Sequence, residues 1–223
     1  RRWKEALESD ELRFFFLVVS GATILITLAN LGVYTSVWES LRYAVFQVAS
    51  IISTTGFATA DYVLWPQFSQ MILILLMFCG ACAGSTGGGM KCARILLLGK
   101  AMKSTVKQSL HPRSVNLIRM DGRRVEESTM QGLYGYVMAY GFILVLSFLI
   151  LSLDRLSLET NMTAVMACLN NIGPGLDLVG PTGNYSVFSA LSKFTLMVDM
   201  LLGRLEIFPL LIMLSPHTWR KAG

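Results

Sequence analysis

The sequence contains the stretch Ser53-Thr54-Thr55-Gly56-Phe57, and a second polar, glycine-bearing stretch, Asn170-Asn171-Ile172-Gly173-Pro174-Gly175, begins 117 residues later. We call them the first turn (residues 53–57) and the second turn (residues 170–175). Each follows a mildly apolar segment, residues 39–53 or 159–171, that is too short to cross a bilayer comfortably. Longer apolar segments flank both short ones. The sequence therefore predicts a span, a short helix and a second span, a unit that occurs twice.

The composition predicts an integral membrane protein. Of the 223 residues, 53% are hydrophobic and 15% are charged, whereas a soluble domain carries about 25% charged residues. Three runs of 20, 29 and 26 residues contain no charge, and each is long enough to cross a hydrocarbon core of about 30 Å. A fourth apolar run includes four charged residues. The expected spans are residues 14–33, 62–90, 128–153 and 186–214.

The positions of Lys and Arg decide how the short segments lie. Four occur in residues 1–13, nine in residues 91–124, and two at Arg220 and Lys221. Because cytoplasmic loops carry an excess of Lys and Arg, an even number of crossings must separate these regions. Each short segment is therefore expected to be re-entrant, entering and leaving by the outer face. The expected cytoplasmic segments are residues 1–13, 91–127 and 215–223.

These segments define an all-α integral membrane protein with two span–re-entrant helix–span repeats. We expect residues 1–104 to form the first repeat, with a broken second span, and residues 128–223 to form the second. Residues 105–127 are expected to be a cytoplasmic basic linker. The sequence opens with Arg1-Arg2-Trp3, and we expect it to be a piece of a longer polypeptide.

The two turns have the chemistry of a cation site. Ser36 and Glu39 have the spacing of a capping box, and Ser157 precedes Glu159, so both short helices have N-terminal signals. The C-terminal end of a helix attracts cations, and inward-pointing carbonyls after it can replace an ion's hydration shell. The alternative is two ordinary helix C-caps with a left-handed glycine. The matched position of both turns in a duplicated unit favours the ion site.

Four motifs carry a resemblance to a known family: Ser53-Thr-Thr-Gly-Phe57, Gly84-Ser-Thr-Gly-Gly-Gly-Met-Lys91, Asn171-Ile-Gly-Pro-Gly175 and Gly203-Arg-Leu-Glu206. With them the sequence resembles the Trk/Ktr/HKT superfamily of potassium transport proteins, most closely the C-terminal half of the TrkH-type membrane subunit. The resemblance covers essentially all 223 residues. It implies a pseudo-fourfold, potassium-channel-like pore to which each repeat gives one filter strand. The implied K⁺ ligands are the carbonyls of Thr54, Thr55, Gly56, Asn171, Ile172 and Gly173.

The same resemblance implies a setting and partners. It implies a bacterial inner-membrane protein that conducts K⁺ and needs a missing N-terminal half, with a second copy as the less favoured source of the other half ring. It further implies a homodimer and a cytosolic ring of nucleotide-binding regulatory subunits. The basic loop of residues 91–127 is suited to anionic membrane lipid or to a cytosolic partner. We expect neither a nucleic-acid partner nor an organic cofactor.

A cluster of glycines interrupts the expected span of residues 62–90. Gly80 and residues 84–89 hold five glycines together with Ser85 and Thr86, and each glycine costs a helix about 1 kcal/mol relative to alanine. Interrupted spans are typical of transport sites, while close helix packing is the alternative. A phosphate-binding loop is excluded because Met90 separates Gly89 from Lys91. The Cys79-Gly-Ala-Cys82 sequence is expected to hold buried, inert thiols rather than zinc or a redox pair.

Arg204 places a charge inside the last apolar span. Such a residue normally faces a cavity or a partner, and the alternative here is an internal salt bridge with Asp199 or Glu206. The resemblance implies that this buried arginine and the glycine-rich loop form a gate beneath the filter. For Lys91, contact with the gate and snorkelling to the interface both stay open. The expected gate residues are Gly84, Ser85, Thr86, Gly87, Gly88, Gly89, Lys91 and Arg204.

The predicted function is K⁺ uptake through a gated pore, without covalent chemistry. One alternative is an intramembrane enzyme, which would need a paired nucleophile and base, or metal ligands, inside the spans. His111 lies in the basic loop and His217 lies beyond the last span, so neither serves. A membrane scaffold without a pore is the other alternative, but it would not need two matched re-entrant turns.

Overall fold

The computed structural model describes residues 9–85, 87–111, 117–205, 207 and 209. Its α-helices are α2 (Asp10–Ala29), α3 (Val37–Ile52), α4 (Gln67–Phe78), α5 (Cys92–Leu110), α6 (Glu127–Leu151), α7 (Leu158–Leu169) and α8 (Ala190–Leu205). The 3-10 helices are η1 (Asn30–Gly32), η2 (Tyr62–Leu64), η3 (Ser152–Asp154), η4 (Asp177–Val179) and η5 (Tyr185–Val187). The strands are β1 (Cys79–Gly80), β2 (Met90–Lys91), β3 (Arg119–Met120) and β4 (Arg123–Arg124).

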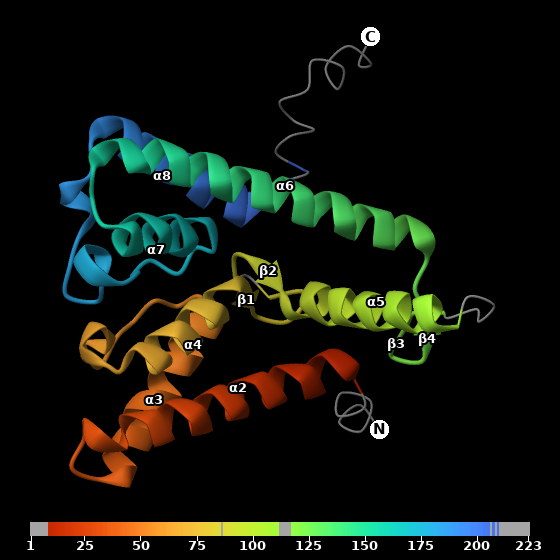
Figure 1. The fold of residues 1–223 in the computed structure, drawn as a ribbon, viewed down its shortest axis with the longest axis horizontal. Helices are drawn as coiled ribbons and strands as arrows, with labels where there is room; N and C mark the ends of the chain where they lie inside the picture. The colour runs from red at the N-terminus through yellow and green to blue at the C-terminus, as the bar shows by residue number, and fades with distance from the viewer. Residues whose placement is uncertain (1–8, 86, 112–116, 206, 208, 210–223) are drawn as a thin grey trace.

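The helices form two groups. Figure 1 shows α2, α3 and α4 on one side and α6, α7 and α8 on the other, with the β1–β2 pair between them. The order of long helix, short helix and further helix occurs in both groups. Helices α2 and α6 begin 117 residues apart, and α3 and α7 end 117 residues apart. The sequence spacing of the two turns therefore extends to the helices around them.

Two helices of the described part are long and apolar enough to cross a membrane. They are α2 extended to Gly32 and α6 extended to Asp154. Helix α6 is apolar all round and leaves Met138, Phe142 and Leu149 exposed, which is typical of a helix that faces lipid. The fourth expected span, residues 186–214, begins in η5 and continues as α8, and its end lies outside the described residues.

The second expected span, residues 62–90, is interrupted where the glycines predicted an interruption. Helix α4 ends at Phe78 after 12 residues, and the chain re-enters a helix at Cys92. Between them β1 and β2 pair in parallel, and a Cβ on Gly80 would lie 2.7 Å from the Gly88 carbonyl oxygen. The chain is mostly helical, as the sequence predicts, and β1–β2 and the antiparallel β3–β4 hairpin add only two-residue strands. The reason is local: glycines let two backbones approach closely enough to pair.

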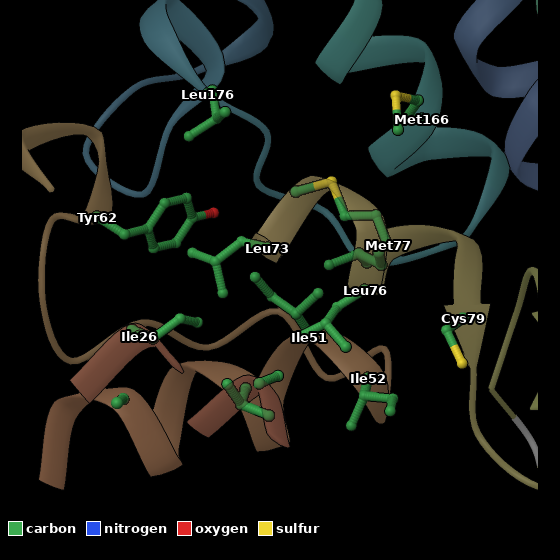
Figure 2. Close-up of a cluster of buried hydrophobic side chains, with 14 of the residues drawn as sticks. Ile26, Ile51, Ile52, Tyr62, Leu73, Leu76, Met77, Cys79, Met166 and Leu176 are labelled. Carbon is green, nitrogen blue, oxygen red and sulfur yellow. The ribbon is translucent and has the colours of Figure 1, made fainter. Parts of the chain in front are cut away.

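The largest cluster of buried side chains joins the two helix groups. Figure 2 shows Ile51, Tyr62 and Leu73 of the first group packed together with Met166 and Leu176 of the second. All five are at most 1% exposed. The two groups therefore share a core, and this core lies beside the ends of α3 and α7.

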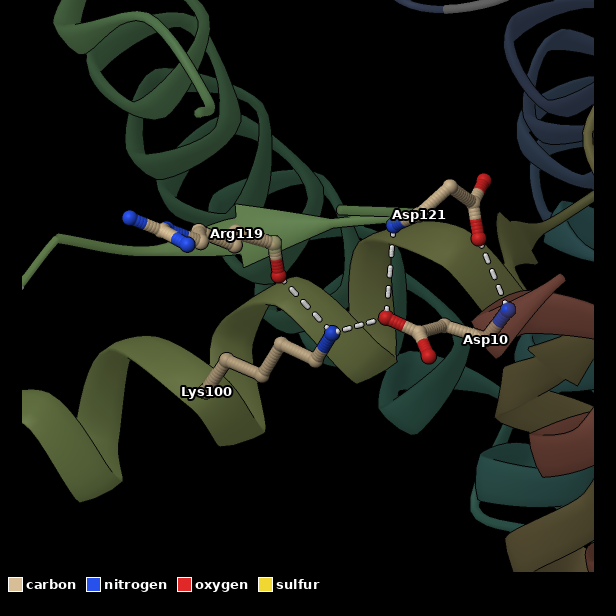
Figure 3. A network of polar contacts seen from close by, with 4 residues as sticks. All are labelled: Asp10, Lys100, Arg119 and Asp121. Atoms are coloured by element: carbon tan, nitrogen blue, oxygen red, sulfur yellow. Dashed lines mark hydrogen bonds and ion pairs between the residues drawn. The ribbon is translucent and has the colours of Figure 1, made fainter. Parts of the chain in front are cut away.

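A polar network ties the start of α2 to α5 and to the β3–β4 hairpin (Figure 3). The Lys100 ammonium lies 2.5 Å from Asp10 Oδ2 and donates to the Arg119 carbonyl at 2.8 Å. The Asp10 N–H donates to Asp121 Oδ1 at 2.7 Å, and the Asp121 N–H donates back to Asp10 Oδ2 at 3.3 Å. Both side chains of the ion pair are about one-third exposed, so water screens the pair and its main effect is to position these segments.

Helix α5 runs past residue 104, the expected end of the first repeat.

Candidate functional site

The two turns have the same backbone hydrogen bonds. After α3, the Thr54 N–H donates to Ile51 O at 3.0 Å and the Thr55 N–H to Ser50 O at 2.9 Å. After α7, the residues 117 positions later repeat both bonds: Asn171 N–H to Cys168 O at 3.0 Å and Ile172 N–H to Ala167 O at 2.9 Å. This pairing is the Schellman motif, which satisfies the last carbonyls of a helix.

The left-handed position of each motif is not a glycine. Thr54 has φ 56° and Asn171 has φ 55°. The alternative of two ordinary helix C-caps predicted glycine at this position, but the structure has Thr54 and Asn171 there. Gly56, with φ 76°, and Gly173, with φ 108°, follow two residues later. Each turn therefore has two residues with positive φ, and Thr54 and Asn171 bear a strain that glycine would avoid.

Serine caps fix the N-terminal ends of both short helices, as the sequence predicts. Ser36 Oγ accepts from the Trp38 N–H at 3.3 Å, and Ser157 Oγ accepts from the Thr160 N–H at 3.1 Å. In a capping box the Glu39 carboxylate would accept from the Ser36 N–H. It accepts from the Thr35 hydroxyl instead.

An acid at the start of η4 supports the second cap. Asp177 Oδ2 accepts hydrogen bonds from Ser157 Oγ at 2.5 Å and Thr160 Oγ1 at 2.6 Å. These two hydroxyls hold the pKa of the Asp177 carboxyl below its usual value. The stabilisation is therefore present at neutral pH and is lost as the pH falls through the lowered pKa. The segment after the second turn is thus tied to the start of α7.

The two turns touch each other through their backbones. A Cβ on Gly56 would overlap the Ile172 carbonyl oxygen and lie 3.1 Å from Pro174 Cδ. Gly173 has open space at the same place, with nothing within 4 Å. Its carbonyl oxygen accepts a hydrogen bond from the Tyr185 hydroxyl at 2.6 Å. Glycine is required at residue 56 by close approach as well as by φ, and at residue 173 by φ alone.

Five of the six expected ligand carbonyls have no donor in the described part of the chain. No described residue donates a hydrogen bond to the carbonyl oxygens of Thr54, Thr55, Gly56, Asn171 or Ile172. The sixth, that of Gly173, accepts from Tyr185. Tyr185 lies 12 residues from Gly173 in a 3-10 helix, and no sequence signal pointed to it.

The glycine loop, residues 81–89 between β1 and β2, packs against both turns. A Cβ on Gly87 would lie 3.0 Å from Thr54 Oγ1, and one on Gly88 would lie 2.6 Å from the Asn170 carbonyl oxygen. A Cβ on Gly89 would overlap Asn170 Oδ1. Close packing thus explains these three glycines, but the packing is against the turns and not between helices. Gly84 has φ 83° and open space, and Thr86 lies outside the described residues.

Two charged side chains hold the glycine loop. Lys91 Nζ donates to the Ser85 carbonyl at 2.9 Å, to the Ser85 hydroxyl at 3.3 Å and to the Gly87 carbonyl. Lys91 is half-buried, so of its two possible roles the structure shows contact with the loop. Glu11, at the start of α2, accepts from the Ala83 N–H at 2.6 Å. The sequence analysis missed Glu11, because its partner is 72 residues away and no motif joins them.

Polar side chains fasten the second turn to α6 and α8. Buried Asn170 accepts from the Tyr140 hydroxyl at 3.0 Å and donates to the Met166 carbonyl at 2.8 Å. Asn171 Nδ2 donates to the Met200 carbonyl of α8 at 3.1 Å. A Cβ on Gly203 would overlap the Leu169 carbonyl oxygen, so α8 crosses the end of α7 at backbone distance.

The sequence predicts a buried Arg204, whereas its side chain is exposed among the described residues. Buried Ser192, Leu196, Asp199 and Leu202 face the protein, and a helix turns by about 200° between residues 202 and 204. The salt-bridge alternative with Asp199 is also not found, because Asp199 accepts from the Ser147 hydroxyl at 2.7 Å. The side chain of Glu206 lies outside the described residues.

The face of α8 that carries Arg204 lines a cavity beside the second turn. The cavity has a volume of about 520 Å³, and its lining includes Ile172, Gly173, Lys193, Met197 and Met200. Positions 193, 197, 200 and 204 share one helix face. Arg204 follows Met200 by about one turn, so it lies past the cavity on the same side of the helix.

The thiols and acids of the described part form no obvious metal site. Cys79 Sγ lies 3.2 Å from Cys92 Sγ across the β1–β2 pair, and the described cysteines are free thiols. Within the described ranges, no group of three or more His, Cys, Asp or Glu side chains could hold a metal ion.

Two helices of membrane-spanning length in the described part agree with a class of membrane proteins whose family model is described as cation transport. It belongs to the TrkH family: the family model, described as a cation transport protein, matches residues 6–221. It is 36% identical over 225 residues to the Trk system potassium uptake protein TrkH of Escherichia coli, covering 99% of this chain and 46% of that protein. It is 40% identical over 188 residues to TrkH of Vibrio parahaemolyticus, covering 84% and 38%.

A solved structure agrees with this assignment. The crystal structure of the potassium transporter TrkH from Vibrio parahaemolyticus superposes with a TM-score of 0.83 at 36% identity, over 96% of this chain and 46% of that one. The chain thus spans about half the length of the relatives that it matches. The expected family is confirmed.

The contact at Gly203 predicts a difference between two glycines in helices. Gly203→Ala should lower the free energy of unfolding by roughly 1–3 kcal/mol, because its Cβ would press on the Leu169 carbonyl and open the α7–α8 packing. The control is Gly132→Ala in α6, where no atom lies within 4 Å and alanine should be neutral or stabilising. Thermal unfolding of the purified variants measures both. Equal stability of the two variants would contradict the close crossing of α7 and α8.

Proposed function

We propose that this chain supplies half of the pore of a potassium uptake protein. The relatives named above are potassium uptake proteins, and the whole pore would need the remaining half of the full-length protein. The observation that carries the proposal is the pair of identical Schellman motifs, 117 residues apart, whose following backbones meet at Gly56 and Ile172. Two helix C-termini converge there with two strands in which five of the six carbonyls have no donor among the described residues, and this arrangement suits a dehydrated cation.

In this proposal residues 1–104 and 128–223 are the two span–pore helix–span repeats and residues 105–127 link them. Thr54, Thr55 and Gly56 of the first turn, with Asn171, Ile172 and Gly173 of the second, form half of the selectivity filter. Five of their six carbonyls are free of donors among the described residues. The Tyr185 hydroxyl on the Gly173 carbonyl leaves that oxygen a second lone pair. The other half ring comes from the N-terminal part of the full-length protein.

The proposed gate is the glycine loop. It lies directly against Thr54 and Asn170, so an ion that leaves the turns meets it first. The Lys91 ammonium donates hydrogen bonds to two carbonyls of the loop, at Ser85 and Gly87. Glu11 accepts from the Ala83 N–H and so ties the loop to α2. Opening would require these bonds to break and the loop to move aside.

Arg204 is proposed to act from the side of the ion path opposite the glycine loop. It lies on the α8 face that lines the cavity at the second turn, and a cation at this depth raises a barrier to K⁺. An exposed side chain is consistent with this role, because the open side of the cavity is where the missing half of the pore would stand.

Membrane orientation and partners complete the proposal. We propose a bacterial inner-membrane protein whose segments 1–13, 91–127 and 215–223 lie in the cytoplasm. The excess of Lys and Arg in these segments then satisfies the positive-inside rule. We propose a homodimer that meets a cytosolic ring of nucleotide-binding subunits through its basic cytoplasmic segments. K⁺ is the transported ion.

Gly56 provides the test of selectivity. Gly56→Ser should force the two turns apart, because the new Cβ would overlap the Ile172 carbonyl. The permeability ratio of K⁺ to Na⁺ should fall by about tenfold, which corresponds to roughly 1.4 kcal/mol of relative binding. Reversal potentials in mixed K⁺ and Na⁺ measure this ratio in the full-length protein. The control is Gly141→Ser on α6, where space is open, and an unchanged ratio in folded Gly56→Ser would refute the filter assignment.

Lys91 provides the test of the loop. Lys91→Met removes the bonds to Ser85 and Gly87 while keeping an unbranched apolar side chain, so the loop should move more freely and K⁺ flux into liposomes should rise severalfold. Arg123→Met, which removes an exposed cation of β4, should leave flux unchanged. If the Lys91 variant folds and conducts at the wild-type rate, the loop is not held shut by this side chain.

Arg204 gives a prediction with two readouts. In this proposal the Arg204 guanidinium faces the water-filled ion path, so Arg204→Ala should change the free energy of unfolding by no more than about 0.5 kcal/mol, while K⁺ flux should rise. Flux and thermal stability are measured on the same purified full-length protein. A loss of stability without a gain in flux would assign Arg204 a structural role and reject its place in the gate.

A further inference from the structure

A basic pocket lies on the second half of α5. It has a volume of about 200 Å³ and is formed between this helix and the segment that leads into β3. Three lysines of α5, at positions i, i+3 and i+7, share one helix face there, and an arginine of β3 completes the group. The charged lining residues are Lys100, Lys103, Lys107 and Arg119, and the others are Ser104, Leu117 and Ile118.

The described residues neutralise the positive charge of this pocket only in part. Lys100 pairs with Asp10 at 2.5 Å. For Lys103, Lys107 and Arg119, no carboxylate of the described residues lies within ion-pair distance. Cations held this close repel one another, so an anion that enters the pocket relieves the repulsion and gains several charge-assisted hydrogen bonds.

An apolar stripe runs along α5 beside the pocket. Met102, Val106 and Leu110 are 70%, 56% and 71% exposed and follow one another at i, i+4 and i+8. They point away from the packed face, where Leu97 and Ala101 are buried. A soluble anion gains nothing from such a stripe. A lipid uses both features, because its phosphate binds the cations while its acyl chains cover the apolar side chains.

The place of α5 in the chain favours the same ligand. Helix α5 begins at Cys92, directly after the glycine loop, and its sequence changes from apolar to basic at Lys100. In the orientation of the proposed function, on which this step rests, that change falls at the cytoplasmic surface of the membrane. The lysines and the neighbouring apolar stripe then lie in the headgroup layer, where an amphipathic helix buries its apolar face at the boundary with the acyl chains.

We propose that the pocket of Lys100, Lys103, Lys107 and Arg119 binds the headgroup phosphate of an anionic phospholipid of the cytoplasmic leaflet, with its acyl chains along Met102, Val106 and Leu110. Lys103 and Lys107 are the exposed contributors and are not engaged in the Asp10 network. Their replacement therefore tests binding without loosening the junction between α2 and α5.

The experiment is a titration of phosphatidylglycerol onto the delipidated full-length protein, followed by native mass spectrometry. The Lys103→Gln/Lys107→Gln variant should bind about tenfold more weakly than the wild type, since each membrane-surface lysine contributes up to about fivefold. The matched control is Arg123→Gln/Arg124→Gln, which removes the same charge from the exposed β4 strand outside the pocket. This control should bind within about twofold of the wild type.

Several results would overturn the proposal. Equal weakening of both variants would mean general charge attraction, and equal binding of phosphatidylcholine would mean that the anionic headgroup is not recognised. Displacement of phosphatidylglycerol by inorganic phosphate at similar concentration would assign the pocket to a free anion. Wild-type binding by Lys103→Gln/Lys107→Gln would exclude the pocket altogether. No ion gradient enters the assay, so its outcome is independent of whether the protein conducts K⁺.

Discussion

The structure depends on the backbone contact between the first and second turns. Gly56 meets the Ile172 carbonyl at a distance that leaves no room for a Cβ, and both residues belong to segments that follow a Schellman-capped helix. The short helices α3 and α7 must therefore end at matching depths. The core in Figure 2 secures this, because side chains of both helix groups are buried together beside the turns.

The glycine loop is shaped by the same constraint. Once the two turns are fixed, the loop has to fit against Thr54 and Asn170, and only glycine fits at residues 88 and 89. Its other contacts are hydrogen bonds from Lys91 and to Glu11, which can break and re-form more easily than packed side chains. A tightly fixed pair of turns beside a loop held by a few polar bonds is an arrangement suited to gating.

The sequence predicted those features that depend on local patterns. The break after Phe78 follows from the clustered glycines, the caps at Ser36 and Ser157 from hydroxyls before apolar segments, and the common spacing of the helix ends from the duplicated turns. The left-handed conformation of Thr54 and Asn171 was not predicted, because neither residue type favours that conformation as glycine does. The Glu11–Ala83 and Tyr185–Gly173 bonds join distant segments without a motif. The exposure of Arg204 depends on how α8 is rotated, which its composition does not determine.

The most direct test of the account is the position of a bound permeant ion. Crystals of the full-length protein grown with Rb⁺ in place of K⁺ should give an anomalous difference peak between the two turns. The peak should contact the carbonyl oxygens of residues 54–56 and 171–173. Excess K⁺ added to the Rb⁺ crystals should lower the peak by competing for the same oxygens, whereas equal Li⁺ should not, because a filter built for K⁺ does not compensate the dehydration of so small an ion. An Rb⁺ peak elsewhere along the chain, with none at the turns, would contradict the assignment of these backbones as half of a cation site.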